Sequence, residues 1–515
     1  MNIVFPGSHC FSCKNPIRFY DNIPILSYFI TRGACRVCGT AFSARYVIIE
    51  LITAFLTVAL FMVYGLNTEF FCYGILTYIL IAITFIDIDH LISKEISSFP
   101  GEYLSSFPNF IEGADFAFAT SELTYRMINS KHQLPEKIAL FWHTTLCSAD
   151  SKVCNERNNI WQIDLFRDHG MGSFKELLVE LAKNPAMIYW LDNNGNHNGA
   201  INENWGRELM ELFALGVGNY SEDDIKEASR AFTGWTIAPK IPRNPLGRFY
   251  WNFEYKAEDH DDGEKTFLGH TGNFNGEDII DILAGQPASP RFLARHLYNF
   301  FVADEAQVPA WNITPPRDPE AIQTLVDAYN DSKGDIRSIL RVLFKSDFFK
   351  NARFEHVKSP AELVVGTVRI AGNYNGPRPG LTALAMECNW QGQELLNPPS
   401  VESWHTGSEW IDGGALVRRV NFAAGVLGDT SLPGVRSVVE GLRSKGSLAP
   451  ADFVTQCLEA LGPLEVSEST HGELLDQAQE DGNLNWGTDE ERTSSEKRVG
   501  IMLALIAASR DYQFA

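Results

Sequence analysis

Residues 202–216 read Asn-Glu-Asn-Trp-Gly-Arg-Glu-Leu-Met-Glu-Leu-Phe-Ala-Leu-Gly, and this stretch indicates the fold class of most of the chain. Its large apolar residues are spaced i, i+4, i+7 and i+8, as Trp205, Leu209, Leu212 and Phe213. That spacing places them on one face of an α-helix. Gly216 and Gly218 follow, and glycine commonly ends helices. The stretch therefore predicts a helix whose apolar face packs against a core.

Helix start signals recur on both sides of this stretch. Ser173-Phe174-Lys175-Glu176 and Ser359-Pro360-Ala361-Glu362 both have the spacing of a capping box. Residues 248–255 are the exception, because their aromatic residues alternate as in a strand. The turn signal Asp261-Asp262-Gly263 then favours residues 266–268 as the return strand. We therefore expect residues 115–515 to form a large α-rich soluble domain with one small β-hairpin insertion.

The polar face of the helix within residues 202–215 carries a cluster of charges. The simplest interpretation is an exposed ion-paired face, worth about 0.3–0.5 kcal/mol per pair. The alternative is an acidic, metal-binding site completed by a histidine from elsewhere. Both interpretations stay open, and the candidate polar site comprises His143, Glu203, Arg207, Glu208, Glu211 and His260.

Four of the nine cysteines form two Cys-x-x-Cys pairs near the N-terminus, Cys10/Cys13 and Cys35/Cys38. Two such pairs can place four thiolates at the corners of a tetrahedron, which suits zinc. The alternatives are two disulfides or free thiols, and a reducing compartment would oppose the disulfides. Residues 1–45 are therefore predicted to form a structural zinc knuckle.

Two apolar runs follow the cysteine pairs. Residues 47–66 contain one charge, Glu50, and residues 70–86 contain none. A 20-residue helix is about 30 Å long, which matches the hydrocarbon core of a bilayer. Lys and Arg within residues 1–93 all precede the first run, so the positive-inside rule places the N-terminus in the cytoplasm. We expect a transmembrane hairpin over residues 46–93, with a buried soluble hairpin as the alternative.

Asp87 and Asp89 lie at the end of the second apolar run. Acidic groups at the edge of a membrane helix are costly and often functional. An aspartic protease needs two carboxylates that share a proton. Residues two apart on a helix point to different faces, so these two cannot form that dyad together. A second catalytic carboxylate would have to come from another part of the chain.

The charge of the chain is unevenly distributed. Residues 1–93 hold five basic and five acidic residues, so residues 94–515 carry the whole net charge of −21. An acidic surface repels a phosphate backbone, which argues against nucleic acid as a partner. Residues 94–114 are rich in Ser, Pro, Gly and Phe, as in a linker. We expect two unrelated parts joined near residue 93.

Several motifs of the first part belong together, and they are Ser8-His9-Cys10-Phe11-Ser12-Cys13, Asn22-Ile23-Pro24, Arg32-Gly33-Ala34-Cys35, Ser43-Ala44-Arg45-Tyr46 and Phe85-Ile86-Asp87-Ile88-Asp89-His90. This set resembles the type IV prepilin peptidases. The resemblance implies an aspartic endopeptidase of the bacterial inner membrane. It would remove the leaders of type IV prepilins and of type II secretion pseudopilins. S-adenosylmethionine would be needed only if the methylating activity of the family is retained.

The same resemblance makes Asp87 the first catalytic aspartate. The second would lie in a Gly-x-Gly-Asp motif, and the nearest approach in this chain is Ser332-Lys333-Gly334-Asp335. The family also has a membrane helix before its cysteines, and here the sequence starts just before Cys10. We therefore expect a truncated peptidase fragment with half a catalytic dyad, and no activity.

A second set of motifs runs through the rest of the chain, and it includes Phe141-Trp142-His143, Asn184-Pro185-Ala186-Met187, Arg207-Glu208-Leu209-Met210-Glu211-Leu212, Phe232-Thr233-Gly234-Trp235, His260-Asp261-Asp262-Gly263 and Lys358-Ser359-Pro360. It resembles the bacterial family known as domain of unknown function 1800. The resemblance implies a helical, exported protein and no established activity. The favoured interpretation is a composite chain without a joint function. The alternatives are an active peptidase with a soluble appendage and a membrane-tethered binding or structural protein.

Overall fold

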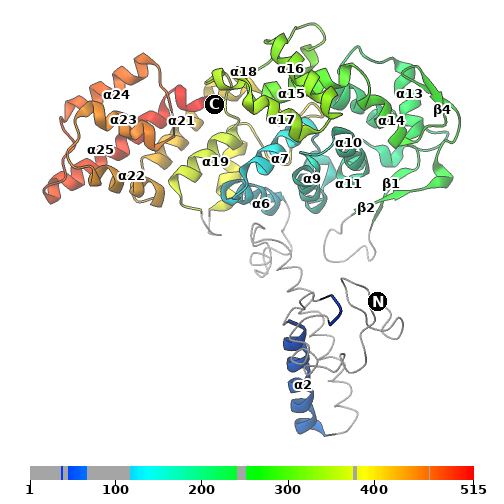
Figure 1. Cartoon of the computed structure of the whole chain (residues 1–515), viewed down its shortest axis with the longest axis horizontal. Coiled ribbons are helices and arrows are strands. Elements are labelled where there is room, and N and C mark those ends of the chain that lie inside the picture. The colour runs from blue at the N-terminus through cyan, green and yellow to red at the C-terminus, as the bar shows by residue number, and fades with distance from the viewer. Residues whose placement is uncertain (1–35, 39–44, 66–115, 240–250, 375–379, 463) are drawn as a thin grey trace. The chain divides into compact units, whose positions relative to one another are not determined.

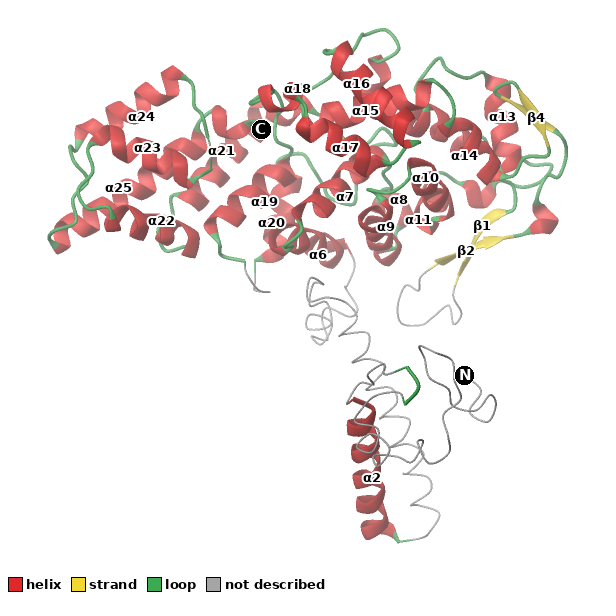
Figure 2. Cartoon of the chain, in the orientation of Figure 1, coloured by secondary structure: helices red, strands yellow, loops and turns green. Residues whose placement is uncertain are grey.

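The computed structural model describes residues 36–38, 45–65, 116–239, 251–374, 380–462 and 464–515. The chain divides into two compact units, Met1–Ser98 and Phe99–Ala515. Helices dominate the described part of the chain, and strands are confined to two short hairpins (Figure 2). The prediction of a mainly helical second unit is thus confirmed.

The first unit contains α2 (Arg45–Tyr64), the helix predicted as the first membrane span. No helix in the described ranges is long and apolar enough to cross a membrane, so the predicted transmembrane hairpin is wrong. The second predicted span, residues 70–86, lies outside the described residues.

The first half of the large unit packs its helices around one apolar core (Figure 1). Its helices are α6 (Phe116–Asn129), α7 (Gln133–Thr145), α8 (Asp150–Val153), α9 (Glu156–His169), α10 (Phe174–Lys183), α11 (Pro185–Trp190), η2 (Asn193–Gly195), α12 (Asn204–Glu208), η3 (Leu209–Ala214), α13 (Glu222–Ala231), η4 (Ala257–Asp259) and α14 (Gly276–Ala284). The core continues through α15 (Ala288–Phe301), η5 (Val308–Ala310), α16 (Pro319–Ser332), α17 (Ile336–Lys345), α18 (Asp347–Asn351), α19 (Pro360–Ala371) and α20 (Leu381–Trp390).

The opening stretch of sequence forms a helix with an unusual turn. Trp205, Leu209, Leu212 and Phe213 are all buried, as their spacing predicted. The α-helix α12 gives way at Leu209 to η3, which is a π-helix with a Leu215 N–H to Met210 carbonyl bond of 2.9 Å. A π-helix has about one more residue per turn than an α-helix. The four-residue spacing of Glu203, Arg207 and Glu211 therefore no longer places all three side chains on the same helix face.

Two antiparallel hairpins follow α13 in the sequence. β1 (Trp235–Pro239) pairs with β2 (Trp251–Tyr255), and β3 (Lys265–Phe267) pairs with β4 (His270–Gly272). The predicted strand at residues 248–255 is confirmed over β2, but its predicted partner at residues 266–268 is wrong. The partner β1 begins at Trp235, directly after the turn Phe232-Thr233-Gly234. The alternation of apolar and polar residues there is too short to indicate a strand.

The second half of the large unit builds a second apolar core. Its helices are η6 (Gly407–Ile411), α21 (Gly413–Leu427), α22 (Pro433–Ser444), α23 (Pro450–Ala460), α24 (Glu468–Glu480), α25 (Asp489–Ala508) and η7 (Asp511–Gln513). The helix α19 contributes to both cores. Its Val364 and Val368 belong to the first, and its Leu363 and Ala371 belong to the second. Burial on two sides makes α19 the helix that joins the halves.

The crossing of α19 and α22 depends on a glycine. A Cβ atom at Gly434 would overlap the carbonyl oxygen of Ile370 and lie 2.9 Å from the carbonyl carbon of Ala371. Both contacts are to backbone, which cannot move aside as a flexible side chain can. Gly441, also on α22, has open space around the corresponding position.

We predict that Gly434→Ala lowers the free energy of unfolding by about 1–3 kcal/mol, because overpacking forces the two backbones apart. The matched variant Gly441→Ala should raise the free energy of unfolding by up to about 1 kcal/mol, since alanine is the better helix former. Urea unfolding followed by circular dichroism measures both. Equal effects of the two substitutions would contradict the close crossing.

Candidate functional site

A groove of about 790 Å³ lies along the first core. It is bounded by α6, α7, α15, α17, α18 and α19. Its apolar lining includes Met127, Leu134, Leu140, Phe300, Phe301, Val302, Phe344, Phe349, Ala352, Ala361 and Val365. A concave, mostly apolar pocket of this size with a few polar groups is the usual form of a small-molecule site.

The helix α19 lines the groove with one stripe of residues. Glu362, Val365, Gly366 and Arg369 line it, and they are spaced i, i+3, i+4 and i+7, so they share one helix face. A Cβ atom at Gly366 would have no neighbour within 4 Å. The glycine therefore leaves empty space in the groove, where a larger residue would fill it.

A cluster of four charged groups lies at one end of this stripe. Lys137 from α7 forms an ion pair with the buried Glu362. Glu362 also lies 3.5 Å from Nε2 of His356, and Nδ1 of His356 lies 2.7 Å from Asp304. The Ser359 N–H donates to Glu362 at 2.7 Å, which completes the capping box of α19. The cluster thus joins α7, the end of α15 and the start of α19.

The cluster holds its charges despite burial. Burial alone would lower the pKa of His356, but its hydrogen bonds to Asp304 and Glu362 raise the pKa to about 9. Burial alone would raise the pKa of Glu362, but Lys137 and His356 hold it well below its ordinary value. The two cations Lys137 and His356 compensate the two carboxylates of Glu362 and Asp304, so the cluster needs no outside counterion. The N–H of Ala515, which also lines the groove, donates to the His356 carbonyl at 2.8 Å.

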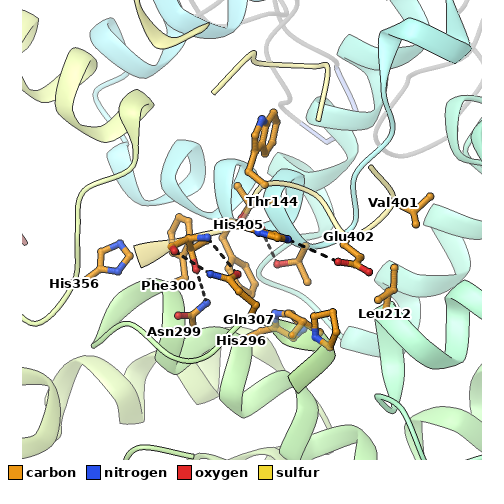
Figure 3. A pocket seen from close by; sticks show the side chains of 16 residues that line it. Thr144, Leu212, His296, Asn299, Phe300, Gln307, His356, Val401, Glu402 and His405 are labelled. Carbon is orange, nitrogen blue, oxygen red and sulfur yellow. Dashed lines mark hydrogen bonds and ion pairs between the residues drawn. The ribbon is translucent and has the colours of Figure 1, made fainter. Parts of the chain in front are cut away.

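A second, smaller pocket of about 50 Å³ shares the lining residues His356 and Phe300 with the groove (Figure 3). His296 and His405 also line it. Burial lowers the pKa of His296 to about 3, so this ring is neutral, and its Nε2 is buried without a hydrogen-bond partner in the described structure. Nδ1 of His405 lies 2.8 Å from Glu409. The volume suits one or two water molecules rather than an organic ligand.

The charges of the predicted polar site are placed on α12 and the π-helix that follows. Arg207 pairs with Glu222 at 2.8 Å and more weakly with Glu203 at 3.5 Å. Glu211 instead accepts a hydrogen bond from Tyr220 at 2.8 Å, because the π-turn separates it from Arg207. Burial, with the nearby charge of Glu211, raises the pKa of Glu208 to about 7.

The two predicted histidines make contacts of their own. His143 is buried beside Trp404 and its Nε2 accepts from the Leu396 N–H at 3.0 Å, with its pKa lowered by burial to about 3. Nδ1 of His260 lies 2.9 Å from the Thr233 carbonyl oxygen. Among the described residues no group of three or more His, Cys, Asp or Glu could hold a metal ion.

The predicted sites of the first unit fall almost wholly on residues that the structure does not describe. Asp87, Cys10, Cys13 and Cys35 lie outside the described ranges, and Cys38 is exposed. The zinc knuckle and the catalytic aspartate therefore stay predictions.

The groove and its charged cluster were not predicted from the sequence. Glu362 was visible only as the last residue of a capping box. No sequence motif surrounds Asp304, Lys137 or His356. Their membership of the cluster is recognised only from their proximity in the folded chain. An acid at the third position of a largely apolar helix was the one available signal.

The fold and its groove define a mainly helical protein with a preformed pocket, joined to a separate N-terminal unit. The chain belongs to the family of proteins of unknown function designated DUF1800, whose model matches residues 111–514. Residues 1–64 match the model of the bacterial peptidase A24 N-terminal domain. Both predicted resemblances are confirmed, and the chain is a fusion of parts from two families.

Curated relatives match the N-terminal region. The prepilin leader peptidase/N-methyltransferase of Aeromonas hydrophila is 39% identical over 99 residues, which are 19% of this chain and 34% of that protein. The protein of the same name from Neisseria gonorrhoeae is 44% identical over 88 residues, 17% of this chain and 31% of its own length. The chain thus spans about a third of these relatives. No solved structure matches the chain.

The charged cluster predicts a pH dependence of stability. The pKa of His356 is about 9 in the folded protein and about 6.5 when unfolded, so its stabilising effect is complete below pH ~6.5 and disappears as the pH rises through ~9. We expect the stability difference between the wild type and His356→Gln to shrink by roughly 3 kcal/mol between pH 6 and pH ~9.5. Urea unfolding at a series of pH values measures it.

The half-exposed His405 provides the control for this experiment. His405→Gln should leave the pH profile of the wild type almost unchanged, because an exposed pair contributes little. Lys358, whose pKa is lowered to about 8 by burial, titrates in both proteins and cancels in the difference. A constant difference across the whole pH range would show that His356 is not held as an imidazolium.

Proposed function

We propose that the large unit is a binding protein and that the groove along α19 binds an elongated apolar ligand. The observation that carries this proposal is a groove of about 790 Å³ with largely aromatic and aliphatic walls. Burying apolar ligand surface there contributes about 25 cal/mol per Å². The groove is also preformed, so little conformational entropy is lost on binding.

The charged cluster supports binding more than catalysis. The four charged groups are already paired with one another: Lys137 with Glu362, and His356 with Glu362 and Asp304. These pairs fix the distance between α7 and α19. Fixed helices preserve the width of the groove when it is empty. The cluster then acts on the ligand by keeping the site open.

Filling the groove should abolish binding. Gly366→Leu places an apolar side chain in the empty space on α19 and favours the helix, so the fold should be retained. We expect the full chain to bind the neutral apolar dye N-phenylnaphthylamine at one site, with a rise in fluorescence. Gly366→Leu should weaken the affinity by about tenfold or more, equivalent to about 1.4 kcal/mol.

The matched control is Gly441→Leu, which makes the same change on an exposed helix face away from the groove. It should bind the dye with the affinity of the wild type. Dye that does not bind, or that binds both variants equally well, would contradict the groove as a binding site.

We further propose that residues 1–98 do not cleave prepilins. Aspartic proteolysis needs a second carboxylate beside the first. Asp87 is the single aspartate that the family motif identifies, and Gly-x-Gly-Asp does not occur in the sequence. Cleavage of type IV prepilins is the activity that the names of the relatives suggest. The match covers about a third of those proteins.

We predict that membranes from cells producing the full chain leave the leader of a type IV prepilin intact, because the dyad is incomplete. Asp87→Ala and the neighbouring Asp89→Ala should both behave as the wild type. A complete prepilin peptidase in the same assay provides the positive control. Leader cleavage that is lost in Asp87→Ala but kept in Asp89→Ala would refute this proposal.

A further inference from the structure

We propose that the ligand of the groove is a single-chain amphiphile whose anionic headgroup binds Arg369. This inference rests on the proposed binding function and names the class of ligand. The apolar walls would hold the chain, and the guanidinium would hold a carboxylate or a phosphate. Such anions accept two parallel hydrogen bonds from arginine.

Arg369 is placed for this role by α19 and α6. It lies seven residues beyond Glu362 on the groove stripe, about 10 Å along the helix axis. Its Nη1 donates to the carbonyl oxygens of Ile128 at 2.7 Å and Met127 at 3.5 Å, near the end of α6. These bonds fix the guanidinium and leave its other N–H groups available. Among the described residues no carboxylate forms an ion pair with Arg369.

The other cations of the groove are already paired. Lys137 pairs with Glu362, Lys350 with Asp347, and Arg353 with Glu465. Arg369 is therefore the groove cation that keeps its charge for a ligand.

The two acidic side chains of the groove are compensated too. Glu136 accepts two hydrogen bonds from Nε of Arg167, at 3.0 and 3.1 Å, and Glu362 is held by Lys137 and His356. A cationic ligand would thus find neither acidic side chain open, whereas an anion finds Arg369. Arg369 lines the groove and is exposed, so within a chain of net charge −21 it offers a local positive charge to an anionic headgroup.

The test is displacement of N-phenylnaphthylamine from the full chain by ligands with the same twelve-carbon chain. Dodecanoate and dodecyl phosphate are the anions, and dodecanol and dodecyltrimethylammonium are the neutral and cationic comparisons. We expect at least one anion to displace the dye at about tenfold lower concentration than dodecanol, equivalent to about 1.4 kcal/mol. The stronger of the two anions identifies the headgroup.

Arg369→Gln should reduce the preference for the anion to about twofold or less while the affinity for the neutral dye stays the same. Arg369→Lys should keep part of the preference, and Arg443→Gln, which removes an exposed cation on α22, should keep all of it. Equal displacement by anion and alcohol, a stronger cationic ligand, or an anion preference that survives Arg369→Gln would each overturn this inference. If the dye still binds in those cases and Gly366→Leu abolishes that binding, the groove remains supported as a binding site. If the dye does not bind at all, the proposed binding function is itself contradicted.

Discussion

The buried carboxylate of Glu362 is the constraint on which the large unit depends. An ionised carboxylate removed from water is costly unless charges and hydrogen-bond donors surround it. Here Lys137 comes from α7, His356 from the segment before α19, and the Ser359 N–H from the helix start itself. Lys137 lies 225 residues from Glu362 in the sequence, so satisfying this one carboxylate fixes how α7 meets the start of α19.

The consequences extend through α19. Its first turn is held by the cluster, its two buried sides complete the two cores, and its last turn crosses α22 at Gly434. The face that remains lines the groove. A helix that is held at both ends and buried on two sides presents its remaining face with little mobility. Low mobility of that face is the condition for a preformed site. The binding surface and the stability of the domain therefore have the same physical origin.

Local patterns in the sequence predicted what local physics decides. The apolar spacing of Trp205, Leu209 and Leu212 gave a buried helix face, and Ser359 gave a capping box, because both depend on neighbours within one or two turns. The partner of β2 and the π-turn at η3 were not predictable, since pairing and an extra residue per turn are selected by tertiary contacts. The predicted transmembrane hairpin is wrong, since no helix among the described residues is long and apolar enough to cross a membrane. The groove was invisible because Lys137 and Asp304 approach His356 and Glu362 only in the folded chain.

The position of residue 515 has a practical consequence for protein engineering. Its N–H is bonded to the carbonyl of His356, and Phe514 forms an isolated β-bridge with Val357, so the last residues are fastened beside the charged cluster. Any affinity tag or fluorescent fusion appended after Ala515 would emerge at the wall of the groove and compete for its space. The loop between α22 and α23, residues 445–449, contributes no residue to the groove and offers an attachment point that leaves it clear.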